Sequence, residues 1–195
     1  MPSSFNALDN PGRRTALRAG SLGVLSVAAI GVLAGSPAMA RAKDASRGDV
    51  DILNVALGLE HEAIAAYQAG AESELLQKPV LDVAVQFQGH HKAHRDALIT
   101  AVTKLGGVPV QSKSMSVYAT GLGLSAVKSQ ADILRLAQRL ERGAANAYIG
   151  VMPSFHEKAF AQVCARLAAD EVMHWTALSQ ALGDALPAMP LTFGG

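Results

Sequence analysis

Residues 51–67 read DILNVALGLEHEAIAAY, and residues 132–148 read DILRLAQRLERGAANAY. The two stretches align without gaps at an offset of 132 − 51 = 81, and in each the apolar residues recur at the three- and four-residue spacing of an amphipathic α-helix. A second helical pattern begins near Pro79 and matches a later one at an offset of 80. The chain is therefore predicted to contain a helical hairpin that is repeated once.

Four helices are expected from this periodicity and from the residues that can begin and end them. They are predicted at about 49–71, with Asp49 or Asp51 as the N-terminal cap, and at 79–105, 126–148 and 156–182. The links within each hairpin are short, whereas residues 106–125 are long enough to cross a bundle about 30 Å tall. These lengths predict an all-α four-helix bundle, in which a long crossover without regular structure joins two antiparallel hairpins.

Ligand-type side chains fall on the apolar stripes of all four predicted helices. A carboxylate on such a stripe costs several kcal/mol unless it is paired or binds a metal ion. The first and third helices each carry one carboxylate at equivalent repeat positions. The second and fourth helices each carry two ligand-type side chains, His or Glu, spaced three residues apart and therefore on one face. The predicted metal ligands are Glu60 and Glu141, His91 and His94, and Glu171 and His174. Such donors suit one or two transition-metal ions, and iron is expected first, with zinc, manganese or copper as alternatives.

Helices that bear Glu, Glu-x-x-His, Glu and Glu-x-x-His resemble those of the di-iron carboxylate proteins in the ferritin-like superfamily. The stretch from Asp49 to Glu60 also resembles the start of the bacterial ferritin-like domain family, and the resemblance covers about residues 49–183. It implies a ferritin-like bundle. It also implies that Glu60 and Glu141 are terminal ligands, that Glu171 bridges two ions, and that His94 and His174 each bind one.

The sequence departs from the family pattern at His91, where the family places a second bridging Glu. Two divalent ions carry a charge of +4 and three carboxylates carry −3, so an excess of +1 remains. A second ion is therefore expected to bind more weakly, and a mononuclear zinc or copper site becomes an alternative. His90 could replace His91 as a ligand, whereas its repeat mate Asp170 is expected on a solvated face. A further alternative is a metal-free network of hydrogen bonds that includes Tyr67 or Tyr148.

The N-terminal residues have the order of an export signal. Arg13 and Arg14 precede an apolar run at 19–35, and the small residues Ala38 and Ala40 then mark a cleavage site. The paired arginines resemble a twin-arginine signal. The expected organisation is a signal peptide at 1–40, a linker at 41–48, the bundle at 49–183 and a C-terminal tail at 184–195. The mature protein is expected in the periplasm or otherwise outside the cytoplasm, without a membrane anchor.

Composition limits the other function classes. The formal net charge is +1, and residues 41–195 carry 17 − 3 = 14 basic and 16 − 1 = 15 acidic side chains, which indicates no nucleic-acid partner. Cys164 is the only cysteine, so neither an intramolecular disulfide nor a site of several thiolates can form.

Metal ions are the expected partners, and a homo-oligomer is compatible with the sequence. The sequence favours an iron-handling or di-metal redox protein that reacts with Fe(II) and with O2 or peroxide in stress protection. Whether the protein is an enzyme stays open. The alternatives are a structural or binding bundle, either metal-free or stabilised by zinc, and a metal carrier.

The predicted signal peptide can be tested by following export of the protein. Mass spectrometry of the exported protein should show an N-terminus at Arg41, and replacing Arg13 and Arg14 with lysine should hold the precursor in the cytoplasm. Unchanged export in a strain that lacks the twin-arginine translocase would contradict this prediction.

Overall fold

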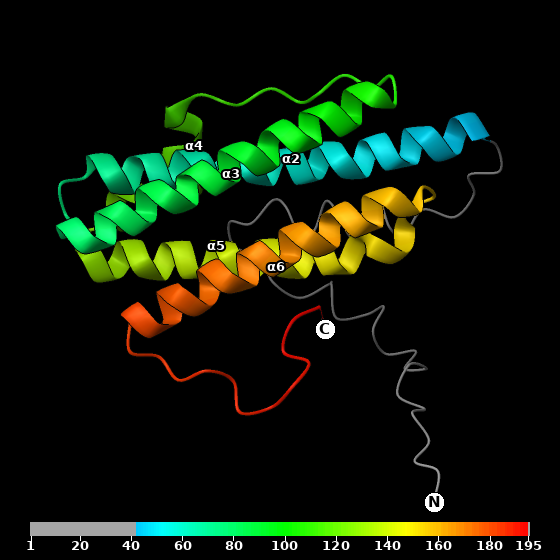
Figure 1. Cartoon of the computed structure of the whole chain (residues 1–195). Coiled ribbons are helices and arrows are strands. Elements are labelled where there is room, and N and C mark those ends of the chain that lie inside the picture. The colour runs from blue at the N-terminus through cyan, green and yellow to red at the C-terminus, as the bar shows by residue number, and fades with distance from the viewer. Residues whose placement is uncertain (1–41, 195) are drawn as a thin grey trace, which may run out of the picture.

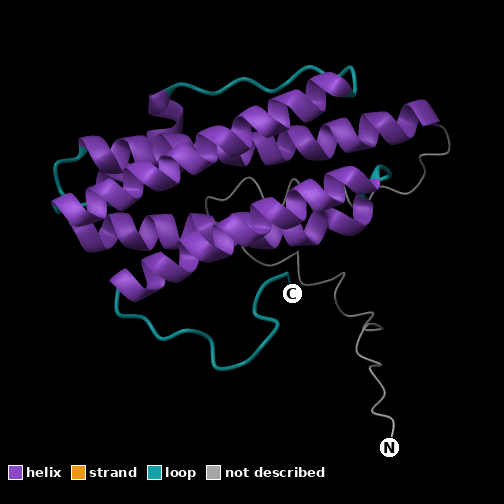
Figure 2. Cartoon of the chain, viewed as in Figure 1, coloured by secondary structure: helices purple, strands orange, loops and turns teal. Residues whose placement is uncertain are grey.

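Four long helices form the body of the molecule (Figures 1 and 2). The computed structural model describes residues 42–194, and over these residues it contains helices and no strand. The long helices are α2 (Ala42–Glu72), α3 (Lys78–Lys104), α5 (Gln130–Val151) and α6 (Lys158–Ala181). The expected all-α bundle is confirmed, whereas the predicted signal peptide at 1–40 lies outside the described residues.

Local signals begin and end several of these helices. Pro79 lies in the first turn of α3, where its missing N–H has no helical partner to lose. Ser129 caps α5, since its hydroxyl accepts a hydrogen bond from the backbone N–H of Asp132 at 3.2 Å. Gly183 follows α6 with φ of 73°, a left-handed conformation that favours glycine.

The first helix begins earlier than expected. α2 starts at Ala42, so the residues predicted as a linker are helical from 42 onward, and Asp49 lies inside the helix. The prediction that Asp49 or Asp51 caps this helix is wrong, because both lie inside α2. The buried carboxylate of Asp49 accepts hydrogen bonds from the backbone N–H groups of His156 and Glu157, both at 3.0 Å, just before α6 begins. Asp49 therefore ties the start of α2 to the start of α6.

The crossover between the hairpins contains regular structure that the sequence analysis did not predict. It includes the short helix α4 (Met115–Gly121) and a 3-10 turn at Leu124–Ala126. Figure 1 shows the crossover returning along the outside of the α2–α3 hairpin to the end where α5 begins. The side chain of Asn54 in α2 makes two hydrogen bonds to the crossover. Its Nδ2 donates to the carbonyl of Val108 at 3.0 Å, and its Oδ1 accepts from the backbone N–H of Val110 at 2.8 Å.

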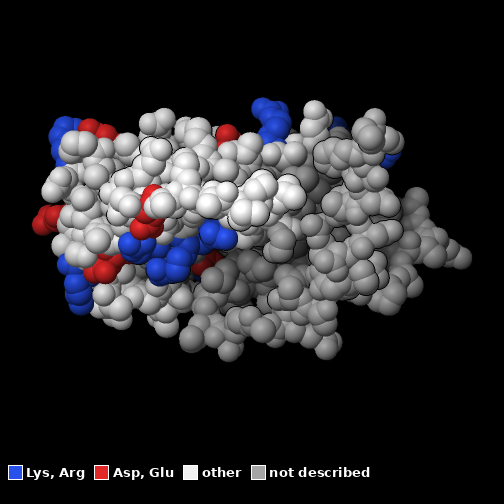
Figure 3. All heavy atoms as spheres, turned by 90° about the horizontal axis from the view of Figure 1, so that it is seen from below, with Lys and Arg blue, Asp and Glu red and all other residues white. Residues whose placement is uncertain are grey.

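The apolar core forms two clusters along the bundle. The larger cluster includes Leu53 of α2 and Leu98 of α3, and the smaller includes Tyr67 and Phe87 of the same helices. The residues between these positions on α2 and α3 therefore lie between the clusters, at mid-length of the bundle. On the face drawn in Figure 3, Lys and Arg are interspersed with Asp and Glu. Among the described helices, none has the length and apolar character needed to span a bilayer.

The contact made by Asp49 generates a stability prediction. Asp49→Ala should lower the free energy of unfolding by about 1–3 kcal/mol, because two backbone N–H groups before α6 lose their acceptor. Asp51→Ala is the matched control, and it should change stability by no more than about 0.5 kcal/mol. Urea unfolding of the metal-free mature protein, followed by circular dichroism, measures both. Equal losses in the two variants would contradict the assigned contact.

Candidate metal centre

The six predicted ligands meet at mid-length of the bundle, between the two apolar clusters. All are buried, and none is more than 6% exposed. They form two overlapping groups, in each of which one ligand-type atom per residue lies within 4.8 Å of the others. The first group is Glu60, His91, His94 and Glu171, and the second is His91, Glu141, Glu171 and His174.

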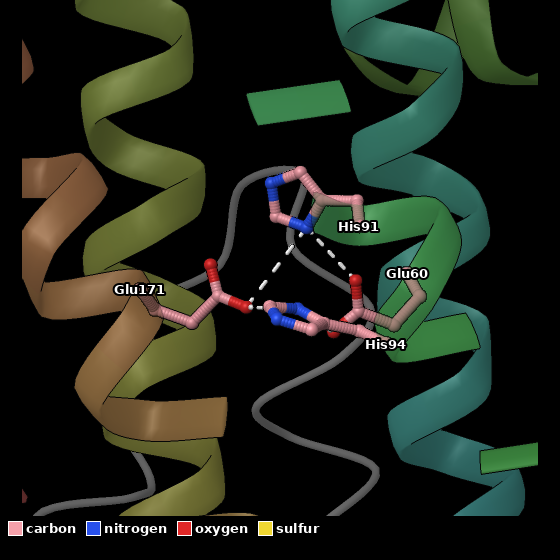
Figure 4. A group of neighbouring side chains, drawn as sticks. All are labelled: Glu60, His91, His94 and Glu171. Atoms are coloured by element: carbon pink, nitrogen blue, oxygen red, sulfur yellow. Dashed lines mark hydrogen bonds and ion pairs between the residues drawn. The ribbon is translucent and has the colours of Figure 1, made fainter. Parts of the chain in front are cut away.

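The first group draws its side chains from α2, α3 and α6, and Figure 4 shows them pointing toward one another. Nδ1 of His91 lies 2.8 Å from Oε2 of Glu60. Nδ1 of His94 lies 3.2 Å from Oε1 of Glu171 and 3.6 Å from Oε1 of Glu60. Two imidazoles and two carboxylates therefore converge without an intervening apolar group.

The second group adds Glu141 from α5 and His174 from α6. Nε2 of His91 lies 3.2 Å from Oε1 of Glu141, and Nδ1 of His174 lies 3.3 Å from both Oε2 of Glu141 and Oε2 of Glu171. His91 and Glu171 are thus shared between the groups. His91 directs Nδ1 toward Glu60 and Nε2 toward Glu141. Glu171 directs Oε1 toward His94 and Oε2 toward His174.

Two tyrosines cross between the hairpins to hold the outer carboxylates. The hydroxyl of Tyr67 on α2 donates a hydrogen bond to Glu141 on α5, and the hydroxyl of Tyr148 on α5 donates to Glu60 on α2. The two hydrogen bonds are equivalent under the internal repeat. Each tyrosine lies seven residues after the Glu of its own helix, but it donates to the Glu of the other hairpin, a pairing that the sequence did not predict.

Glu171 differs from the other two carboxylates. Among the described residues, neither of its oxygens has a hydrogen-bond partner, and the same is true of Nδ1 of His94. The approaches of 3.2–3.3 Å that these atoms make do not have hydrogen-bond geometry. An unsatisfied buried carboxylate is costly, and metal coordination is one way to remove that cost. The residues present therefore fit a metal ion.

The ionisation of the metal-free centre follows from burial and from the close contacts. Burial would raise the pKa of Glu60, but contacts with His91 and His94 hold it at about 2. Burial and the neighbouring Glu141 raise the pKa of Glu171 to about 7. Burial disfavours the charged form of His94, yet the carboxylates of Glu171 and Glu60 raise its pKa to about 10. Without metal, protons therefore supply the positive charge that these carboxylates require.

His90 and Asp170 lie behind the two groups rather than within them. Nδ1 of His90 is 2.9 Å from Nε2 of His174, and Oδ2 of Asp170 is 3.1 Å from Nε2 of His94. The structure thus places His91, and not the alternative His90, among the converging side chains. Asp170 is half-exposed as expected, but its contact with His94 was not predicted. Partners of this kind orient metal-binding imidazoles and fix their tautomers.

Two cavities lead toward the centre. One of about 400 Å³ is lined by His90, His94, Arg166 and Asp170, between α3 and α6. The other, of about 30 Å³, lies beside His91 and between α2 and α5, and it has room for about one water molecule. His94 therefore borders the larger of these cavities, and His91 and Glu141 border the smaller one.

Comparison with known proteins agrees with this architecture. A solved structure of a conserved hypothetical protein, rv2844, from Mycobacterium tuberculosis matches with a TM-score of 0.59 at 21% identity, and it covers 73% of this chain and 100% of that one. This likeness concerns the fold alone. No curated protein matches the sequence. The family model described as "Ferritin-like domain" matches residues 48–184, and the chain therefore belongs to the ferritin-like domain family.

Proposed function

We propose that this protein is an exported metal-binding protein that holds one or two transition-metal ions between Glu60, His91, His94, Glu141, Glu171 and His174. The observation that carries the proposal is the pair of overlapping groups that share His91 and Glu171, together with the unsatisfied oxygens of Glu171. A structural network needs no such convergence of unpaired acceptor atoms at the centre of a core.

The donor set favours iron as the native metal. Three imidazoles and three carboxylates suit Fe, Zn, Mn or Cu, and ferritin-like carboxylate bundles typically bind iron or manganese. Since His91 stands where a further carboxylate would complete the charge balance, three carboxylates leave an excess of +1 against two divalent ions. The first ion is therefore expected to bind more tightly than the second.

The chemistry proposed for this centre is iron handling or redox protection, with Fe(II) and either O2 or peroxide as reactants. A bound iron ion would supply the electron transfer. Tyr67 and Tyr148 hold Glu141 and Glu60 in place, while His90 and Asp170 orient His174 and His94. The apolar clusters cover the centre on either side along the bundle, while the cavities beside His94 and His91 leave room for water and small reactants.

A second candidate is a bundle without turnover, and one observation favours it. Tyrosine and histidine side chains already satisfy Glu60 and Glu141, so part of the site is a complete hydrogen-bond network. A zinc-stabilised bundle or a metal carrier would use the same side chains. Oxygen consumption on addition of Fe(II) separates these candidates from the redox protein.

Export by the twin-arginine route is part of the proposal. It rests on Arg13, Arg14 and the cleavage motif ending at Ala40. This route carries folded proteins, and a bundle whose ligands come from four different helices can bind a metal tightly only after folding. Loading in the cytoplasm would then precede transport to the periplasm.

The metal proposal predicts a ligand-specific loss of binding. His91→Ala removes a side chain that belongs to both groups, so it should weaken the binding of the tightest ion by roughly 100-fold or more, because loss of an orienting partner alone costs 10–100-fold. His61→Ala is the matched control, since the His61 ring faces the carbonyl of Val110 in the crossover at 3.1 Å. Calorimetric titration of metal-stripped protein with Fe(II), Mn(II), Zn(II) and Cu(II) measures both. If no ion binds wild type more tightly than His91→Ala, the metal proposal is wrong and the hydrogen-bond network should replace the metal site.

The same centre predicts a pH dependence. In the folded metal-free protein the pKa of His94 is raised from 6.5 to about 10 and that of Glu171 from 4.5 to about 7. The folded state therefore holds more protons than the unfolded state, and the free energy of unfolding should fall as the pH rises from about 5 towards 10. Metal ions compete with these protons, so their affinity should rise by roughly tenfold per pH unit for each proton displaced.

Thermal unfolding with and without Zn(II), at about pH 6 and about pH 8, measures this coupling. The difference in Tm between the zinc-loaded and the metal-free protein should widen at the higher pH. A difference that narrows would show that the ion does not replace protons on these side chains.

A further inference from the structure

One end of the bundle contains an apolar cavity of about 220 Å³. It lies where α2 turns into α3, beside the first turns of α5 and the last turns of α6. Among the described residues that line it, only Tyr67 carries a polar side-chain atom. That hydroxyl is already engaged, because it donates to Glu141. The walls therefore offer contact surface to an apolar molecule and no free hydrogen-bonding side chain.

The internal repeat shows how the sequence produces this cavity. At the repeat offset of 80, Val80 corresponds to Phe160 and Ala84 corresponds to Cys164. Phe160 and Cys164 are buried in the larger apolar cluster, whereas Val80 and Ala84 line the cavity. The first turns of α3 therefore carry smaller side chains than the equivalent turns of α6, which lie at the other end of the bundle. Since protein interiors are normally close-packed, a space of this size between the helix ends is a departure from ordinary core packing.

The cavity adjoins the metal centre through two aromatic rings. The ring of Tyr67 lines the cavity while its hydroxyl reaches Glu141. The ring of Phe87 also lines it and stacks on the imidazole of His174, with ring centroids 4.1 Å apart. A molecule in the cavity would therefore lie one ring away from the candidate ligands. Val83, which is 40% exposed, belongs to the same lining and places the cavity within reach of solvent.

We propose that this cavity is a binding site for a small apolar molecule, of the size of a single aromatic ring or a short alkyl chain. A dry apolar cavity of about 150 Å³ in another protein is large enough to bind benzene, and this one is larger. The proposal goes beyond the metal function and does not depend on it, because none of the six candidate metal ligands is among the residues that line the cavity.

The test uses toluene as the probe and benzoate as its charged counterpart, in calorimetric titrations of the metal-free and zinc-treated mature protein. Wild type should bind toluene at least tenfold more tightly than benzoate. Val80→Phe copies the side chain of Phe160 into the cavity, so it should reduce toluene affinity at least tenfold and raise the Tm of the free protein. Val85→Phe is the matched control on an exposed position of α3, and it should leave toluene affinity unchanged.

Ala84→Leu fills the cavity from a second position and keeps the test decisive if Val80→Phe does not fold, as judged by circular dichroism. The proposal is overturned if wild type does not bind toluene, if benzoate binds equally well, or if the folded filling variants bind toluene as wild type does. Toluene binding by a protein that binds none of Fe(II), Mn(II), Zn(II) and Cu(II) would support the cavity and remove the metal proposal. Failure of the cavity proposal can therefore be distinguished from failure of the metal proposal.

Discussion

Three carboxylates buried at the centre of an apolar bundle are the constraint on which the rest of the structure depends. Each must be compensated, because an isolated buried carboxylate is strongly unfavourable. Glu60 and Glu141 receive a tyrosine from the opposite hairpin and share the ring of His91 between them. Glu171 receives no hydrogen bond among the described residues, and its oxygens face both groups of ligand-type atoms. The need to compensate Glu171 is the physical reason to expect a metal ion.

The repeat explains both the symmetry of the centre and its exceptions. Equivalent tyrosine–glutamate pairs connect the two hairpins, as expected for a duplicated unit. His91 occupies the position equivalent to Glu171, and its two nitrogens face two carboxylates, so an imidazole lies where symmetry would place a further carboxylate. Val80 lines a cavity at one end of the bundle, whereas Phe160 at the equivalent repeat position lies in the larger apolar cluster. The functional differences between the halves are therefore concentrated at a few positions.

Much of this architecture could be predicted from sequence because helical periodicity and a gapless repeat are local signals. They located the four long helices, the long crossover and the six side chains that the structure brings together. The sequence did not predict that Asp49 holds the start of α6, that α4 forms in the crossover, or that Asp170 contacts His94. These features depend on which helices become neighbours in space, and no pattern within a single helix reports that. The predicted start of α2 was wrong for the same reason, since an aspartate that binds backbone N–H groups before a distant helix looks, in the sequence, like the cap of its own helix.

The central claim is that the buried side chains bind a metal ion, and X-ray diffraction from crystals of metal-loaded mature protein tests it most directly. Anomalous scattering at the absorption edge of the added metal locates bound ions without assumptions about the ligands. The account predicts one or two anomalous peaks, one among Glu60, His91, His94 and Glu171 and the other among His91, Glu141, Glu171 and His174. Peaks found only at surface side chains, with the buried carboxylates hydrogen-bonded to histidine and tyrosine as in the metal-free network, would contradict it.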